Sequence, residues 1–516
     1  MLSEAWKVRT PYIGAVVFGV LFAALIGKFL LLEPRYALAA ITGVVLLSVA
    51  ISLANRLSDV LLYVLAFNLP FTSIEKTFLI TQQTTFETAG IALGLSDLVL
   101  IAVYAVWFAR IFITHQERFP RPTKLDWAVL AFVAVHALST VFAVSTSLAL
   151  LEVIRLGKYA LMYFFVAHKL EKRHLRTVIA GIFFAIVLQS GLGIVQQRTG
   201  HLLGIGRTKG ASDIEYEQYT VTGFEQARAE GTTFDSHALG LFFAMTLPIP
   251  LALVLSPWSS TRAKIASGAV LLVGLPELTA TFARAGWVAF GVAGSAILAC
   301  FVKWRQWRRV LVAAAVLAVI GTTTLLPFAS AIRTRLFEAP PELITARIET
   351  IKMALQIWRD HPWTGCGANS YMKALENKFS IFEGDPYFIP PHNMMVFILT
   401  EVGVIGLAVF AVLCVFILKT QWTVISRGDT QHRVLAAALL GAFLGFQAEG
   451  ITDPIYITNV TYYLLWFEVG TLAAMAASVM AAPEPTRATA PSLSPTRQLS
   501  RTWSEASCDL RRADES

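Results

Sequence analysis

Residues 390–406 read PPHNMMVFILTEVGVIG and join a polar insert to the beginning of a long apolar run. The insert covers residues 329–391, a length of 63 residues, and apolar segments precede and follow it. Apolar runs of about 20 residues predict helices that cross a membrane. The stretch therefore predicts a folded, Arg-rich segment that is held, with His392, against the outer face of a membrane. Chemistry on a membrane-anchored substrate would take place there.

The composition is that of a polytopic membrane protein. The 516 residues are 56% hydrophobic and 15% charged, with a mean hydropathy of +0.62, whereas soluble domains carry about 25% charged residues. The net charge is +8, but the basic residues form short clusters between apolar runs and not one face of a soluble domain. This pattern is typical of membrane topology and indicates no nucleic-acid partner.

The apolar runs predict an all-α polytopic membrane protein with 12–14 transmembrane helices. Residues 283–286 separate the ninth and tenth runs so briefly that a bent pair or a re-entrant turn is expected there. The fourteen runs are 11–32, 36–54, 57–71, 97–114, 126–144, 148–168, 177–196, 237–256, 265–283, 286–303, 310–328, 394–418, 434–449 and 460–480.

If all fourteen runs cross the membrane, the seven basic clusters of the sequence fall on the same side of it. Loops rich in Lys and Arg stay in the cytoplasm, so both termini are expected there. The clusters are Lys7/Arg9, Arg56, Arg118/Arg121/Lys124, Lys169/Lys172/Arg173/Arg176, Arg262/Lys264, Lys303/Arg305/Arg308/Arg309 and Arg427/Arg433.

The predicted organisation has four parts. A tail rich in Pro, Ser, Thr and Arg is expected to be disordered. The parts are transmembrane helices over 1–328 with outer loops near 72–96 and 197–236, a large outer loop at 329–393, transmembrane helices over 394–480, and a cytoplasmic tail over 481–516.

Inside the insert, residues 345–360 predict an amphipathic helix. Apolar residues recur at spacings of three and four from Ile348 to Trp358. Pro362 ends the helix, because the residue before a proline avoids helical geometry. Residues 365–367, Gly-Cys-Gly, predict a tight turn after it. We expect this helix to lie along the membrane surface or to cap a cavity beneath it.

Two insert residues are candidates for chemistry. His392 stands at the junction of loop and span, and an imidazole can take a proton from a hydroxyl group. The alternative is an interfacial histidine that bonds the loop backbone. Arg347 is expected in the first turn of the insert helix, where a cation opposes the helix dipole unless an anion such as phosphate lies nearby. The alternative is a surface arginine paired with Glu349 or Glu342.

Further cations occur in the transmembrane part. Arg284 lies between two apolar runs, where an arginine is costly and usually faces a cavity or a partner. It would pair with Glu277, seven residues earlier, or contact a ligand phosphate. Arg228 precedes a span and would either add another cation to the site or be an ordinary loop residue.

Three charged residues, Glu152, Arg155 and Lys158, follow one another at spacings of three. They would pair among themselves, or the two cations would line the same polar cavity.

The remaining polar signals are weaker. Asp453 and Glu449 are expected to be structural caps, and Asp235 with His237 supplies two ligands, which do not make a metal site. The sequence contains neither a nucleotide-binding loop nor a paired-carboxylate motif for a metal-bound nucleotide sugar. No metal and no cofactor are therefore expected.

Several of these stretches resemble the signature of the O-antigen ligase/polymerase superfamily. They cover residues 220–410. The resembling stretches are PHN at 391–393, LTEVGVIG at 399–406, the region 347–367 ending in HPWTGCG, FARAG at 282–286, and RAEGTTF at 228–234. In the fourth stretch the family has a Ser-Arg-Gly segment, so Ala283 and Ala285 depart from it and Arg284 is the matching element.

The resemblance implies a GT-C-type glycosyltransferase in the bacterial inner membrane. The implied donor is a glycan on undecaprenyl diphosphate, and the implied acceptor is a glycan, lipid A-core or a protein. His392 would act on the acceptor hydroxyl, and Arg284 and Arg347 would hold the diphosphate, without a metal. Further candidate substrate-binding residues are Arg228, Arg155, Lys158, Asn393 and Glu401.

The acceptor is left open by the sequence. Ligase, polysaccharide polymerase and protein O-oligosaccharyltransferase are the choices, and the tail, the extra spans and the Arg228 segment favour the first two. A transporter or flippase of a lipid-linked or anionic substrate is the competing class. It predicts charges deep in several spans, whereas these candidates gather toward the outer surface.

Overall fold

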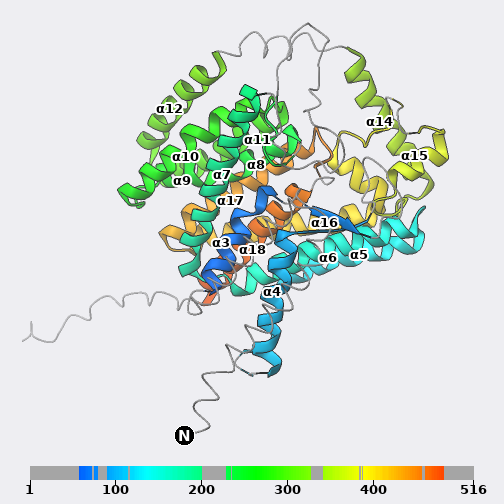
Figure 1. Cartoon of the computed structure of the whole chain (residues 1–516), viewed down its shortest axis with the longest axis horizontal. Helices are drawn as coiled ribbons and strands as arrows, with labels where there is room; N and C mark the ends of the chain where they lie inside the picture. Colours follow the sequence, from blue (N-terminus) through cyan, green and yellow to red (C-terminus); the bar gives the residue numbers. More distant parts are fainter. Residues whose placement is uncertain are drawn as a thin grey trace, which may run out of the picture.

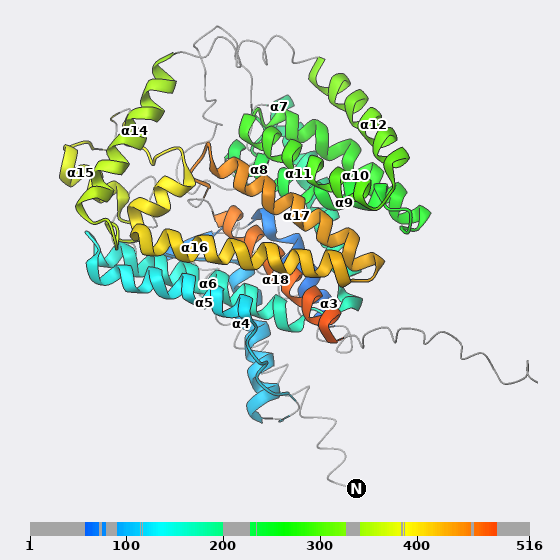
Figure 2. The same ribbon diagram turned by 180° about the vertical axis from the view of Figure 1, so that it is seen from behind.

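The part of the protein that the structure describes is a helical bundle (Figures 1 and 2), to which one short hairpin is added. The computed structural model describes residues 57–71, 75–78, 90–113, 115, 117–199, 228–233, 235–326, 341–382, 385, 387–455 and 459–481. The predicted spans 11–32 and 36–54, most of the two smaller outer loops and the tail beyond residue 481 lie outside these residues.

The transmembrane part consists of helices. Its elements are α3 (Leu57–Phe67), η2 (Leu69–Phe71), α4 (Leu95–Phe108), η3 (Ala109–Ile113), α5 (Lys124–Ser139), η4 (Thr140–Phe142), α6 (Thr146–Lys169), η5 (Lys172–His174), α7 (Leu175–Thr199), α8 (Ser236–Thr246), α9 (Pro248–Leu255), α10 (Thr261–Ala280), α11 (Arg284–Lys303), α12 (Trp307–Leu325), α16 (Met394–Arg427), α17 (Thr430–Gly450) and α18 (Asn459–Ala481). Strands β1 (Glu75–Phe78) and β2 (Ile91–Gly94) pair antiparallel in the predicted outer loop 72–96.

The all-α multi-pass membrane fold expected from the sequence is confirmed. Of the fourteen predicted spans, two lie outside the described residues, and the other twelve each fall on a helix. Within the described part of the chain, seven helical stretches are long and apolar enough to cross a membrane. They are Lys124–Phe142, Lys172–Thr199, Ser236–Leu255, Thr261–Ala280, Arg284–Lys303, Met394–Arg427 and Asn459–Ala481.

Helices α11 and α17 pack closely because small residues face each other. A Cβ on Gly441 would lie 2.6 Å from the carbonyl oxygen of Ala293, and one on Gly445 would lie 2.6 Å from that of Ala289. Small residues four apart let helix backbones approach in a membrane, where the hydrophobic effect does not drive helices together. This contact fixes α17, and with it the turn that follows α17.

The link between α10 and α11 is a tight bend at residues 281–283. Phe282 has a left-handed backbone (φ 51°), and Arg284 is the first residue of α11. The bent pair, one of the two arrangements expected here, is therefore the one observed.

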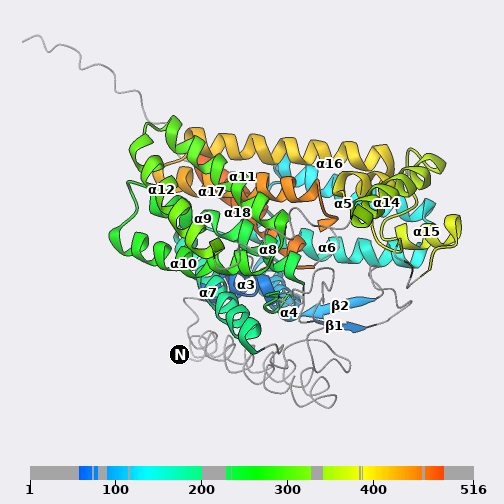
Figure 3. The same cartoon turned by 90° about the horizontal axis from the view of Figure 1, so that it is seen from above.

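The insert folds into two helices, α14 (Pro341–Asp360) and α15 (Tyr371–Phe379). Figure 3 shows them gathered at one end of the long helix α16, with α10 and α12 toward the other end. Helix α14 ends at Asp360, as predicted, but begins four residues before the predicted start. Arg347 is consequently not in the first turn, and the expectation that it opposes the helix dipole there was wrong.

Helix α16 is broken at Gly403 (φ 68°, ψ −171°), and the insert occupies the break. Two hydrogen bonds of a regular helix are missing at this point, which leaves two carbonyl groups and two N–H groups without a helical partner. Residues 362–367 form hydrogen bonds with all four of these groups. The buried backbone therefore stays fully paired, as it must away from water. The bonds run from Cys366 N–H to the Thr400 carbonyl (2.9 Å), Gly367 N–H to Glu401 (2.9 Å), Val404 N–H to Pro362 (2.9 Å) and Ile405 N–H to Trp363 (3.4 Å).

Candidate active site

His392 lies between the insert and α16, and its position is fixed by its neighbour Asn393. The Asn393 side chain caps α16 by accepting a hydrogen bond from Val396 N–H (3.0 Å). The Asn393 Nδ2 group also donates to the carbonyl of Ile451 (3.0 Å), in the turn after α17. Asn393 thus joins the start of α16 to this turn, which brings His392 next to Asp453.

The imidazole of His392 pairs with the carboxylate of Asp453. His392 Nδ1 lies 3.0 Å from Asp453 Oδ1, and both side chains are largely buried. A carboxylate next to Nδ1 favours the tautomer with a proton on that nitrogen. Nε2 is then the basic nitrogen, and the carboxylate stabilises the imidazolium that forms when Nε2 takes a proton.

A second histidine and two further carboxylates surround this pair. His237 Nδ1 lies 3.8 Å from Asp453 Oδ2, and Asp235 caps α8 by accepting from His237 N–H (2.8 Å). Glu449 is 1% exposed, and its Oε2 has no hydrogen-bond partner in the described structure. Asp453 and Asp235 both act on Glu449 electrostatically.

This grouping was missed by the sequence analysis, which took Asp453 and Glu449 as structural caps. Only the pairing of Asp235 with His237 gave a signal, because the two are close in the chain. Among the described residues, no three His, Cys, Asp or Glu side chains are placed to hold a metal ion.

Arg228 and Arg284 lie at the bend between α10 and α11. Arg228 is buried and donates through Nε to the carbonyl of Thr281 (3.0 Å), and Ala229 N–H donates to the carbonyl of Ala280 (3.1 Å). The segment before α8 is therefore fastened to the bend that carries Arg284.

The first turns of α8 and α11 lie side by side, which brings Arg284 toward the histidines. A Cβ on Gly286 in α11 would lie 3.2 Å from the Cα of Gly240 in α8. Arg284 is two residues before Gly286, and His237 is three residues before Gly240. Arg228 and Arg284, here called the cationic edge, therefore adjoin the cluster of histidines and carboxylates.

The alternative pair of Arg284 with Glu277 is not formed among the described residues. The Glu277 Oε1 atom has no hydrogen-bond partner there. It lies against α7, 1.5 Å from where a Cβ on Gly193 would be. Glu277 therefore does not neutralise Arg284.

Arg347 has no hydrogen bond or ion pair for its guanidinium group within the described residues. Glu349, one of its suggested partners, pairs instead with Lys352 (2.7 Å); the side chain of Glu342, the other, lies outside the described residues. At spacings of three and four, Arg347 shares a helix face with the buried residues Thr350 and Ala354. This cation is half-buried, and its contact with a phosphate stays a prediction.

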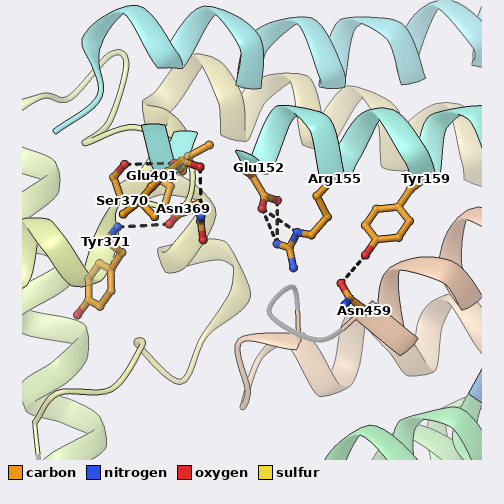
Figure 4. A network of polar contacts seen from close by, with 10 residues as sticks. Glu152, Arg155, Tyr159, Asn369, Ser370, Tyr371, Glu401 and Asn459 are labelled. Carbon is orange, nitrogen blue, oxygen red and sulfur yellow. Dashed lines mark hydrogen bonds and ion pairs between the residues drawn. The ribbon is translucent and has the colours of Figure 1, made fainter. Parts of the chain in front are cut away.

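Arg155 and Lys158 both form ion pairs within the bundle. Arg155 makes a two-pronged contact with Glu152 (2.7 and 2.8 Å), shown in Figure 4, and Lys158 contacts Asp97 (3.1 Å). The pairing expected for Arg155 is thus present, whereas Lys158 pairs outside its own helix. Their role in substrate binding stays a prediction.

Glu401, a residue of α16, forms another connection between this helix and the insert. Its Oε1 accepts a hydrogen bond from Tyr371 N–H (3.4 Å) at the start of α15, near Ser370 and Asn369 in Figure 4. Asn369 Nδ2 donates to the carbonyl of Leu148 in α6 (3.1 Å). Glu401 therefore helps to seat the insert, and its predicted contact with substrate stays a prediction.

The fold and the site define a multi-pass helical membrane protein with a polar insert, next to which a His–Asp pair joins the start of α16 to the turn after α17. Residues 268–411 match the O-antigen ligase family. No curated protein matches the chain. The match confirms the expected resemblance of this segment to the O-antigen ligase/polymerase superfamily, whose members are glycosyltransferase-like enzymes that act on lipid-linked glycans. It includes Arg284, Arg347, His392 and Glu401, whereas Asp453 and His237 lie outside the matched segment.

Proposed function

We propose that the protein transfers a glycan from undecaprenyl diphosphate to an acceptor hydroxyl at the periplasmic face of the bacterial inner membrane, with both termini in the cytoplasm. The observation that carries the proposal is the 3.0 Å contact of His392 Nδ1 with Asp453 Oδ1. It leaves Nε2 as the base in a region that adjoins a cationic edge. Such a base and such cations are what glycosyl transfer from a diphosphate requires.

In the proposed reaction His392 Nε2 removes the proton from the acceptor hydroxyl. The acceptor oxygen attacks the anomeric carbon of the donor glycan, and the bond from that carbon to the diphosphate breaks. The electron pair of this bond leaves with the diphosphate, whose negative charge grows in the transition state. Arg284, Arg347 and Arg228 stabilise this charge, because guanidinium groups bind phosphate oxygens in a two-pronged geometry.

Ligation to a lipid-anchored glycan or polymerisation of glycan repeats is the form of the reaction that we propose. Protein O-oligosaccharyl transfer shares the same donor and differs in the acceptor. A transporter of a lipid-linked substrate needs binding cations but no base, and the His392–Asp453 pair favours the enzyme over it.

The test uses purified protein in proteoliposomes with lipid-linked glycan extracted from the host, candidate acceptors and EDTA. We expect the wild type to consume the donor in EDTA, because the proposed chemistry needs no metal, and the His392→Ala variant not to. The product identifies the acceptor as a glycan, lipid A-core or a protein. Donor that crosses the membrane without being consumed would instead establish the transporter.

A further inference from the structure

We propose that His237 is a positioning residue that relays the proton collected by His392 to the outer solution. The inference rests on the proposed function, since a relay needs a proton to move. It is carried by the geometry around Asp453, whose two carboxylate oxygens face two different histidines.

Asp453 forms a bridge between the two imidazole rings. Oδ1 is 3.0 Å from His392 Nδ1, and Oδ2 is 3.8 Å from His237 Nδ1. The second distance is longer than a hydrogen bond, and the proposed transfer needs a small rotation of the His237 ring to close it. The rings come from different elements, because His392 precedes α16 and His237 lies in the first turn of α8.

The exposed fractions of the three side chains fit a relay that runs from His392 through Asp453 to His237. The His392 side chain is 25% exposed, Asp453 is 13% exposed and His237 is 39% exposed. His237 is thus the member of this group most open to solvent, and His392 is the member placed at the junction with the insert. The proposed path therefore leads from the junction with the insert, through the least exposed member, to the most exposed one.

The surrounding charges give His237 a reason to accept a proton. Asp235 lies two residues before it, and Asp453 and the buried Glu449 belong to the same cluster. The two aspartates beside the histidines stabilise an imidazolium. Arg284, in the adjoining first turn of α11, carries a positive charge and therefore opposes the formation of this imidazolium.

The steps balance in protons and electron pairs. The acceptor O–H proton passes to His392 Nε2, and the O–H electron pair forms the new glycosidic bond. His392 gives its Nδ1 proton to Asp453, which holds it only in passing and gives it to His237 Nδ1, so the carboxylate is ionised before and after the transfer. His237 releases its Nε2 proton to solvent, and the diphosphate departs with the electron pair of the broken bond. Proton exchange with solvent then returns both rings to their starting tautomers, which makes His392 Nε2 a base again.

The experiment measures turnover of the lipid-linked glycan by His237→Ala and His237→Gln, with imidazole titrated into the assay. His361→Ala, in the exposed turn after α14, is the matched control and should turn over like the wild type. We expect His237→Ala to lower kcat by roughly 10–100-fold, as when a group that orients an active-site histidine is lost, with little change in KM. Imidazole should restore much of this rate, and glutamine, which cannot relay a proton, should not. Wild-type turnover of His237→Ala, or full recovery in His237→Gln without imidazole, would overturn the relay.

A second measurement does not depend on turnover. Diethyl pyrocarbonate modifies unprotonated imidazole, and peptide mass spectrometry reports its rate at His392. We expect this rate to fall in His237→Ala, because Asp453 without its second partner interacts with the His392 ring alone and holds it more firmly. An unchanged rate means that His237 and His392 are not coupled and overturns the relay. If the wild type consumes no donor, the proposed function fails, and this labelling result alone decides whether the two histidines are coupled.

Discussion

Gly403 and Trp363 touch backbone to backbone, since a Cβ on Gly403 would lie 2.2 Å from the carbonyl oxygen of Trp363. Gly403 also has a positive φ of 68° with ψ near 180°, a conformation almost restricted to glycine. The same residue therefore breaks α16 and admits the insert into the break. Because the insert leads into His392, the contact that holds the insert also helps to hold His392 in place.

The Gly403→Ala substitution should loosen the insert. The added Cβ needs a strained backbone and displaces residue 363, which we expect to cost about 1–3 kcal/mol. Limited proteolysis of the purified protein measures this effect, with earlier cleavage inside residues 341–391 expected. Gly291→Ala is the matched control, because a Cβ there meets nothing within 4 Å. Equal cleavage of both variants would show that the break does not hold the insert.

The Asp453→Asn substitution should reduce glycan transfer nearly as much as His392→Ala does. An amide in place of the carboxylate no longer stabilises the imidazolium and can hold the wrong tautomer. We expect a fall in kcat of roughly 10²–10⁴-fold for each variant. The assay is donor consumption in proteoliposomes, with Asp360→Asn as a control from the surface of the insert. A double variant that is no slower than the slower single variant would confirm that the two residues act as one unit.

The Arg347→Ala substitution should weaken the stabilisation of the diphosphate. Its guanidinium has no partner in the described structure, so removing it exposes no buried carboxylate and should leave folding intact. We expect kcat/KM for the donor to fall roughly 10²-fold, the loss of one charge-assisted contact in the transition state. Arg359→Ala, in the exposed last turn of the same helix, should keep the wild-type rate. Similar losses in both variants would indicate a general electrostatic effect of the insert.

The local parts of the fold could be predicted from the sequence. Apolar runs identified the spans, and Pro362 with Gly365 located the end of α14 and the turn after it. These features depend on residues within a few positions of one another. The start of α14 was predicted too late, although Pro341 at the first helical position is a recognised start signal.

The arrangement of the site could be predicted only in part. His392 was found through its motif, but its partner Asp453 is 61 residues away and lies in the turn after another helix. No periodicity connects such residues, because packing of α16 against α17 decides their approach. The same holds for Gly403, whose role in the helix break depends on contact with residue 363.

The turn between α16 and α17 should make stability depend on pH. Asp429 caps α17 by accepting from His432 N–H (3.0 Å) and forms an ion pair with Lys172. Burial alone raises the pKa of Asp429, but the hydrogen bonds from Lys172 and His432 outweigh it and hold the pKa below its ordinary value of 3.8. A lowered pKa in the folded state stabilises the fold above the unfolded value, and this contribution is lost as the pH falls through the folded pKa.

Thermal unfolding of detergent-solubilised wild type and Asp429→Asn measures this contribution. Asparagine still caps a helix, so the difference in Tm reports the charge. We expect a small gap at neutral pH, roughly 1–2 °C because the ion pair is half exposed. The gap should begin to narrow as the pH falls below the ordinary pKa of 3.8 and close only when the pH has fallen through the lower pKa of the folded state. A gap that stays constant across this range would mean that Asp429 acts only as a cap and that its pairing with Lys172 adds nothing to stability.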